Sequence, residues 1–207
     1  MTTHFFATGE AGQLEVFVNQ PHGEIKGIAL VTHPHPLMGG NPKHKIPQLI
    51  CEVLVEKGFL VWRPSFRGMG HSQGEHDLGE GESRDIALLA EMMQKQYPNL
   101  PFFGGGFSFG SHVWSKSFHL LPEQQRPQKL LLAGLPCGKV RELVEYKTPH
   151  IDSHLLLVHG EQDDITPLAD VIAWATPQRH PITIMPGANH FFTGYLKSLR
   201  VIIDRYY

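Results

Sequence analysis

The feature that most constrains the fold is a regular alternation of short apolar runs with longer amphipathic stretches. The apolar runs have the length of strands, and the stretches between them carry apolar residues at helical spacing. Because parallel strands need a crossover connection, usually a helix, this alternation predicts a layered, mostly parallel α/β sheet. We expect strands at 27–33, 59–63, 100–107, 129–135, 154–159 and 182–185, and helices at 43–57, 80–97, 108–120, 167–175 and 190–207.

The first residues follow another pattern. Two short runs, at 3–8 and 13–18, meet near Gly9 and Gly12, which predicts an antiparallel hairpin. The 207 residues are enough for one domain with a substantial core, and they contain no internal repeat, linker or low-complexity tract. We therefore expect a single domain over residues 1–207.

Charge and composition narrow the function classes. The 18 basic and 20 acidic residues nearly cancel and form no long block of one sign, so neither nucleic acid nor an anionic membrane is an expected partner. No apolar run reaches the roughly 18 residues that span a bilayer. The first ten residues lack a secretory pattern, and Cys51 and Cys137 form no CxxC pair, so free thiols and a cytoplasmic location are expected. The oligomeric state is not indicated.

Gly106, Ser108 and Gly110 form a G-x-S-x-G motif between a predicted strand and a predicted helix. A serine at such a sharp turn is lifted out at the carboxyl end of its strand, and small flanking residues let helix and strand approach. The motif alone also fits a glycine-rich turn with a solvated serine. Its position and the polar loops downstream favour a nucleophile.

Two nucleotide-binding motifs are excluded nearby. A G-x-G-x-x-G motif from Gly104 would need glycine where Phe109 stands, and a P-loop from Gly134 is one residue short and has Val140 in place of Ser or Thr. We expect no cofactor.

A serine nucleophile needs a base, and the base needs a group that orients it. His190 follows the last predicted strand, and Asp163 and Asp164 follow the strand before it. Both loops leave the carboxyl ends of strands, where open α/β sheets place their sites. His190 is the candidate base. Either aspartate is a candidate partner, but adjacent loop residues point differently, so normally only one reaches the histidine.

Five segments together resemble the α/β-hydrolase superfamily over nearly the whole chain. They are HPHPLMGGN at 33–41, RGMGHSQG at 67–74, GFSFG at 106–110, HGEQD at 159–163 and ANHFF at 188–192. The outline is similar to small bacterial hydrolases with little or no lid, such as dienelactone hydrolases and carboxylesterases. This resemblance implies a three-layer α/β-hydrolase sandwich with the order Ser, Asp, His along the chain, and it favours Asp163 over Asp164.

The resemblance also implies an oxyanion hole. In relatives, the position of residues 33–40 holds a His-Gly turn that donates half of it. Here Pro34 and Pro36 have no N–H, which leaves His35 as the donor of the turn proper. We therefore expect the backbone N–H groups of His35 and Phe109 to hold the oxyanion, each contributing about 3 kcal/mol in the transition state.

Many relatives insert a lid between the strand after the nucleophile helix and the strand before the acid. Here the gap, 136–153, has room for one short helix at 139–146 and no separate cap. We expect little or no lid and an open site. The apolar side chains available to line it are Leu37, Phe107, Phe109, Phe191 and Phe192, and the aromatic ones fit a place in the core equally well.

The 14 histidines raise the alternative of a metal site. His33 and His35 alternate along an extended segment and should point opposite ways, and His44, His71 and His76 lack a tight helical spacing such as H-E-x-x-H. We expect no metal, with His33 fixing the turn by hydrogen bonds. Further structural roles are expected for Arg67 as a hydrogen-bond donor and for Glu80, Glu82 and Asp85 at a helix start.

Together these patterns predict a serine hydrolase that cleaves a carboxylic ester or thioester of a small-molecule acyl substrate through an acyl-Ser108 intermediate. Two alternatives stay open. One is a peptidase or acyltransferase on the same triad, because sequence does not separate these reactions. The other is a non-enzymatic binding protein that retains the fold.

Overall fold

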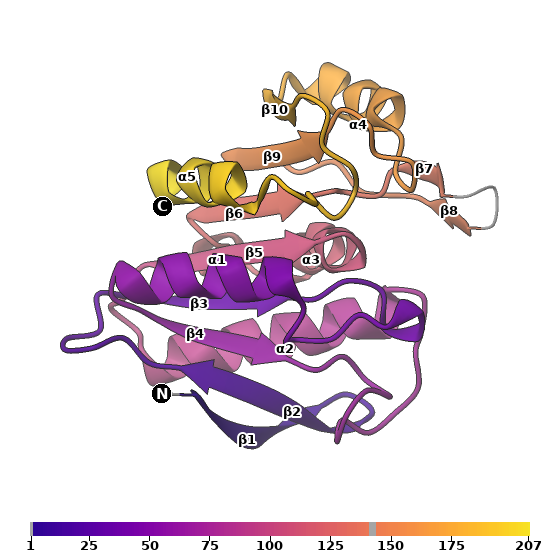
Figure 1. Cartoon of the computed structure of the whole chain (residues 1–207). Coiled ribbons are helices and arrows are strands. Elements are labelled where there is room, and N and C mark those ends of the chain that lie inside the picture. The colour runs from indigo at the N-terminus through magenta and orange to yellow at the C-terminus, as the bar shows by residue number, and fades with distance from the viewer. Residues whose placement is uncertain (1, 141–143) are drawn as a thin grey trace.

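The computed structural model describes residues 2–140 and 144–207. Its main element is a twisted eight-stranded sheet (Figure 1). The strand order is β1 (Thr2–Gly9), β2 (Gly12–Asn19), β4 (Phe59–Pro64), β3 (Gly27–Thr32), β5 (Phe102–Phe107), β6 (Lys129–Ala133), β9 (Leu155–Gly160) and β10 (Ile182–Met185). The pairs β1–β2 and β2–β4 are antiparallel and all others are parallel, as the sequence predicted.

Helices cover both faces of this sheet. Helices α1 (Lys45–Glu56) and α5 (Leu196–Tyr206) pack on one face, and α2 (Glu80–Gln96), α3 (Phe109–Leu120) and α4 (Leu168–Ala175) pack on the other (Figure 1). The result is the three-layer α/β sandwich that the sequence predicted.

The sheet divides the apolar core into two clusters. In β6, Leu130 and Leu132 face the cluster beneath α2 and α3, whereas Leu131 and Ala133 face the cluster beneath α1 and α5. Because successive side chains of a strand point to opposite faces, a strand covered on both sides must be apolar throughout. This explains why the runs in the sequence are continuous rather than alternating.

The expected short helix at 139–146 was wrong. The structure has two short antiparallel strands there, β7 (Gly138–Val140) and β8 (Val144–Tyr146), while residues 141–143 lie outside the described part of the chain. Gly138 has φ +68°, which favours glycine, and Val140 and Val144 are β-branched residues that suit strands. Tyr146 is buried, and its ring contacts that of His112 at 4.9 Å.

The last helix begins later than expected. The sequence predicted it from His190, but α5 begins at Leu196. Phe192 and Gly194 both have positive φ, at +49° and +82°, and these values interrupt a helix. His190 therefore lies in the turns between β10 and α5, at the end of the sheet, and not in the helix.

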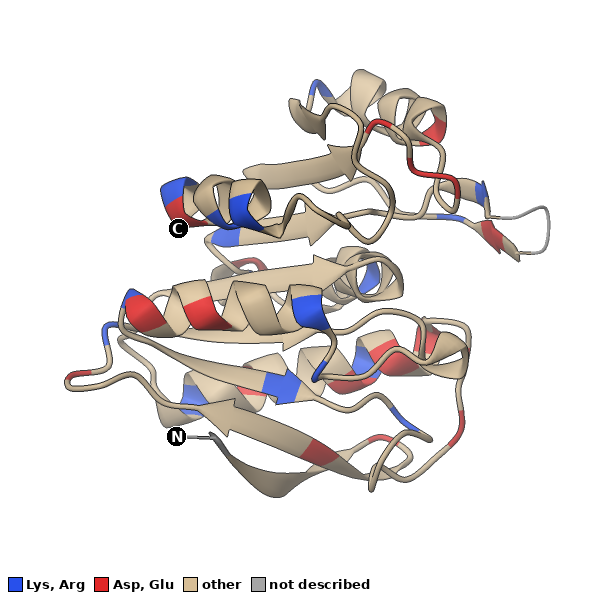
Figure 2. Cartoon of the chain, viewed as in Figure 1, with Lys and Arg blue, Asp and Glu red and all other residues tan. Residues whose placement is uncertain are grey.

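Neither sign of charge gathers on one of the helices. Basic and acidic side chains are mixed along α1, α2 and α5 (Figure 2). In the described part of the chain, no helix is long and apolar enough to cross a membrane.

Candidate active site

Ser108 lies at the sharp turn between β5 and α3, at the carboxyl end of the sheet. Its backbone has φ +54° and ψ −125°, a conformation that non-glycine residues rarely adopt. The turn is held in place because the Ser108 N–H donates to Ala133 O at 2.8 Å, and the Ser111 N–H donates to Ser108 O at 2.7 Å. The strained backbone directs the Ser108 side chain away from the sheet.

The flanking glycines of the motif are needed for space. A Cβ on Gly106 would lie 2.7 Å from the Gly110 carbonyl carbon and oxygen, and one on Gly110 would lie 2.6 Å from His33 O. Both distances are too short for any side chain, so strand, turn and helix approach this closely only with glycine at both positions. The spacing of the motif predicted this close approach of helix and strand.

Three residues from separate loops form a continuous hydrogen-bonded chain at this point. His190 Nε2 is 2.9 Å from Ser108 Oγ, and His190 Nδ1 is 2.7 Å from Asp163 Oδ2. His190 and Asp163 are buried, whereas Ser108 is partly exposed. Asp164 is exposed and belongs to no such chain, so of the two aspartates the structure brings Asp163 to the histidine.

The Asp163 carboxylate accepts several hydrogen bonds. Oδ1 accepts from the N–H groups of Ile165 and Thr166 at 3.0 and 2.8 Å, and Oδ2 accepts from the Thr166 hydroxyl at 2.8 Å. Burial by itself raises the pKa of Asp163, but the hydrogen bonds from His190 and Thr166 outweigh it and hold the pKa below its ordinary value. Asp163 is therefore ionised at neutral pH and able to orient His190.

A second histidine also lies against Asp163. His159 is fully buried, with Nε2 at 2.7 Å from Thr166 O and 3.3 Å from Asp163 Oδ2. Both oxygens are acceptors, so Nε2 carries a hydrogen that it donates to them. Burial lowers the pKa of His159, which favours the neutral ring. His159 thus holds the turn that carries Asp163 without adding a charge.

The predicted oxyanion donors lie on either side of the serine turn. Phe109 is the first residue of α3, and His35 precedes a short 3₁₀ turn, η1 (Pro36–Met38). Neither backbone N–H donates to another group within residues 2–140 and 144–207. His33 fixes this loop: its Nδ1–H donates to Pro34 O at 2.7 Å, and its Nε2 accepts from the Phe66 N–H at 3.0 Å.

A cavity of about 200 Å³ opens above Ser108. Its walls come from the loops after β3, β9 and β10, and they include Met38, His44, Ile165 and Phe191. Burial and the nearby Lys45 lower the pKa of His44 to about 4, so this ring is neutral in the cavity wall.

Most of the aromatic residues that could line the site lie in the core instead. Phe107, Phe109 and Phe192 are fully buried, whereas Phe191 lies in the cavity wall. Leu37 is exposed next to the wall residue Met38. Of the two places open to these phenylalanines, the structure thus puts three in the core and one at the cavity.

Sequence reasoning missed several residues around this site. Thr166 and His159 support Asp163, and His44 caps α1 while its ring stacks on Phe107 at 5.4 Å. The predicted helix began at residue 43, two residues before the observed start of α1, so the sequence did not mark His44 as a capping residue. No local pattern identifies the other two, because their partners are fixed by the fold.

The histidines do not assemble as metal ligands. Within the described ranges, no three His, Cys, Asp or Glu side chains converge in a way that would hold a metal ion. His33 and His44 instead make hydrogen bonds in the loop between β3 and α1. Cys51 and Cys137 are both buried as free thiols.

Known proteins share this architecture. No protein-family model matches the chain. An α/β serine hydrolase homologue from Coxiella burnetii is 31% identical, with a TM-score of 0.85, over 98% of this chain and 96% of that one. An α/β serine hydrolase without a lid from Xanthomonas campestris is 28% identical, with a TM-score of 0.88, over 99% of this chain and 92% of that one. The uncharacterized peptidase YtmA of Bacillus subtilis is 29% identical over 138 residues, 52% of this chain and 53% of that protein.

The likeness to these two solved structures extends over 99% and 98% of this chain. The protein therefore belongs to the α/β-hydrolase superfamily of serine hydrolases.

Proposed function

We propose that the protein hydrolyses a carboxylic ester or thioester through an acyl-Ser108 intermediate. The observation that supports this most directly is the chain of short hydrogen bonds from Asp163 Oδ2 through His190 to Ser108 Oγ, at 2.7 and 2.9 Å. A serine hydroxyl becomes a useful nucleophile only when such a base can take its proton.

In the proposed reaction, Ser108 Oγ attacks the substrate carbonyl carbon while its proton passes to His190 Nε2. The carbonyl oxygen becomes negative and accepts hydrogen bonds from the His35 and Phe109 N–H groups. His190 then protonates the departing alcohol or thiol. Water, deprotonated by His190, attacks the acyl-enzyme, and the acid product and free Ser108 are released.

The cavity supports a small substrate. Its volume of about 200 Å³ is below the roughly 300–1,000 Å³ of ordinary ligand pockets, and its wall is mostly apolar apart from His35, His44, Ser108 and His190. A short acyl chain or a small leaving group fits such a space, and longer groups extend into solvent because no cap covers it within the described part of the chain. We therefore expect kcat/KM to be highest for short acyl chains.

Labelling with a fluorophosphonate tests the nucleophile. Wild type should be labelled stoichiometrically, and Ser108→Ala should not be labelled. Ser198→Ala, on the exposed side of α5, is the matched control and should be labelled like wild type. Absence of labelling in wild type, or equal labelling of Ser108→Ala, would refute the proposal and favour a binding protein.

A peptidase is the second candidate, because the partial relative YtmA is named as one. The same triad cleaves amides when a site binds the peptide on both sides of the scissile bond. Hydrolysis of p-nitrophenyl esters, acyl-thioesters and p-nitroanilides of the same acyl group separates the candidates. An esterase should show measurable kcat/KM only on the first two, and adding alcohol acceptors would reveal acyl transfer.

A further inference from the structure

The two residues that carry the proposed oxyanion donors touch each other and a third residue through their rings. The His35 and Phe109 ring centroids are 4.9 Å apart, and the His76 ring lies 4.8 Å from the first and 5.2 Å from the second. His35 Nδ1 is buried and has no partner within the described residues, so packing rather than hydrogen bonding holds this ring.

His76 lies against a buried carboxylate. Its Nδ1 is 2.8 Å from Glu82 Oε1, a close approach without hydrogen-bond geometry, and the side chains are 9% and 0% exposed. Glu82 accepts hydrogen bonds from the N–H groups of Asp77 and Gly79, at 3.0 and 2.9 Å. The carboxylate therefore ties the segment after His76 to the first turn of α2 and packs directly against the His76 ring.

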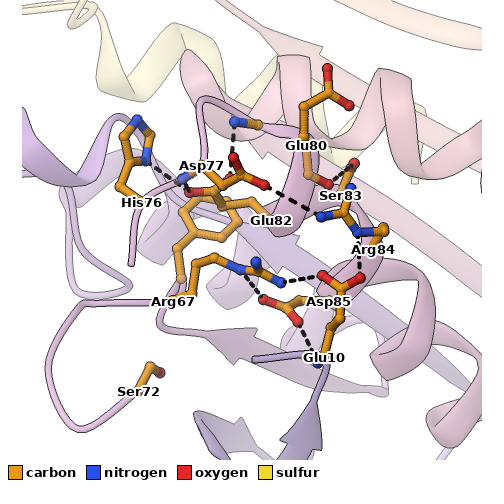
Figure 3. Close-up of polar contacts among 12 residues, drawn as sticks. Glu10, Arg67, Ser72, His76, Asp77, Glu80, Glu82, Ser83, Arg84 and Asp85 are labelled. Atoms are coloured by element: carbon orange, nitrogen blue, oxygen red, sulfur yellow. Dashed lines mark hydrogen bonds and ion pairs between the residues drawn. The ribbon is translucent and has the colours of Figure 1, made fainter. Parts of the chain in front are cut away.

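The start of α2 is itself anchored to the sheet. Arg67 donates to Asp85 at 2.8 Å and to Glu10 at 3.1 Å, and Arg84 donates to Glu10 at 2.7 Å (Figure 3). A side chain on residue 81 would collide with Arg67, because a Cβ there would lie 1.9 Å from Nη1. Helix α2 thus gives Glu82 a rigid base, and Figure 3 shows His76 reaching toward Glu82 from the preceding loop.

We propose that Glu82 and His76 are positioning residues that set the spacing of the two oxyanion donors, acting through the rings of His35 and Phe109. This inference rests on the proposed function, since it assigns the support of the oxyanion hole. The separation of the two N–H groups depends on loops after β3 and β5 that belong to different parts of the chain, and the His76 ring contacts both.

The expected effect falls on the transition state. The oxyanion forms only as the reaction proceeds, so loosened donors lower kcat while KM changes little. Loss of a donor typically lowers the rate by about 10²–10³-fold. Misplacement should cost less, so we expect His76→Ala to lower kcat by roughly 10- to 100-fold, and Glu82→Gln by somewhat less.

The rate constant of fluorophosphonate labelling gives a readout that does not depend on knowing the substrate, because the phosphoryl oxygen also needs the oxyanion donors. His76→Ala and Glu82→Gln should slow labelling in parallel with kcat. Glu91→Gln is the matched control, because it makes the same chemical change at an exposed position of α2, and it should label like wild type. His76→Phe keeps a ring against His35 and should label faster than His76→Ala.

A merely structural role predicts a different ranking. His76→Phe replaces the polar neighbour of buried Glu82 with an apolar ring, so the melting temperature should not recover even though the labelling rate does. Hydrogen exchange of the His35 and Phe109 amides, measured by NMR, requires no catalysis and should accelerate in His76→Ala. Unchanged labelling and exchange in a folded His76→Ala, or a raised KM with unchanged kcat, would overturn the inference. Failure of wild type to label refutes the proposed function instead.

Discussion

The two halves of the candidate site are held by different forces. On one side, the loops after β9 and β10 place Asp163 and His190 through short, directional hydrogen bonds from Thr166, His159 and the backbone. On the other side, hydrogen bonds of His33 fix the loop after β3, and the His35 ring is held by packing against His76 and Phe109. The hydrogen-bonded half therefore depends on donors and acceptors, whereas the packed half depends also on the shape of its rings. Each half should therefore respond to a different kind of substitution.

The largest expected effect tests the hydrogen-bonded half. Asp163→Asn removes the carboxylate that fixes the His190 tautomer, and should lower kcat by about 10⁴-fold. Asp164→Asn makes the same change one residue away on an exposed side chain, and should stay near wild type. Steady-state kinetics on one ester compares the two. Equal losses would contradict the assignment of Asp163 alone as the partner of His190.

The next effect tests the packed half at its backbone. His35 has φ −54°, within the range that proline adopts, and its N–H makes no hydrogen bond to the described residues. His35→Pro therefore removes the proposed donor with little change of backbone, and should lower kcat by about 10²–10³-fold. His35→Ala loses the ring but keeps the N–H and should lose less. If both variants lose the same, the ring rather than the N–H carries the effect.

Acid titration should separate the contributions of His33 and Asp163 to stability, because they change over different pH ranges. Burial lowers the pKa of His33 to about 3, so below the unfolded value of about 6.5 only the unfolded chain takes up this proton. Stability is then lost as pH falls, by about 2 kcal/mol between pH 7 and 5 for this one histidine. The lowered pKa of Asp163 acts elsewhere: its stabilising contribution is present above about pH 4 and is lost as pH falls further.

Urea unfolding at several pH values measures this difference. Between pH 7 and 5, His33→Gln should lose about 2 kcal/mol less folding stability than wild type, whatever its stability at pH 7. Asp163→Asn should leave that loss unchanged and flatten the curve only below about pH 4. A His33→Gln variant with the full wild-type loss between pH 7 and 5 would mean that His33 is protonated in the folded protein.

The smallest effect concerns His159 in the hydrogen-bonded half. His159→Leu removes one donor from Asp163 and should lower kcat/KM by roughly tenfold, since one hydrogen bond to a charged group contributes about 1.5–3 kcal/mol. His159→Gln keeps an N–H near the Nε2 position and should restore kcat/KM. Equal losses in the two variants would assign His159 to folding alone.

Sequence reasoning found the hydrogen-bonded half more readily than the packed half. Ser108, Asp163 and His190 follow the ends of strongly apolar runs, and the carboxyl ends of parallel strands meet at one edge of the sheet. Chain order and strand prediction were therefore enough to place Ser108, His190 and one of two adjacent aspartates at this edge, and the family resemblance favoured Asp163. The oxyanion role of the His35 and Phe109 N–H groups stays a prediction, although the structure places both residues beside the serine turn.

The sequence by itself determined the layered sheet, the hairpin and the serine turn, because each depends on a local pattern: apolar runs, paired short strands, and glycines that a Cβ would forbid. Only the tertiary structure decided which aspartate meets His190, that residues 138–140 and 144–146 pair as strands, and that His76 and Glu82 lie behind His35. These depend on contacts between residues far apart in the chain, whose distances follow from how helices and loops pack on the sheet.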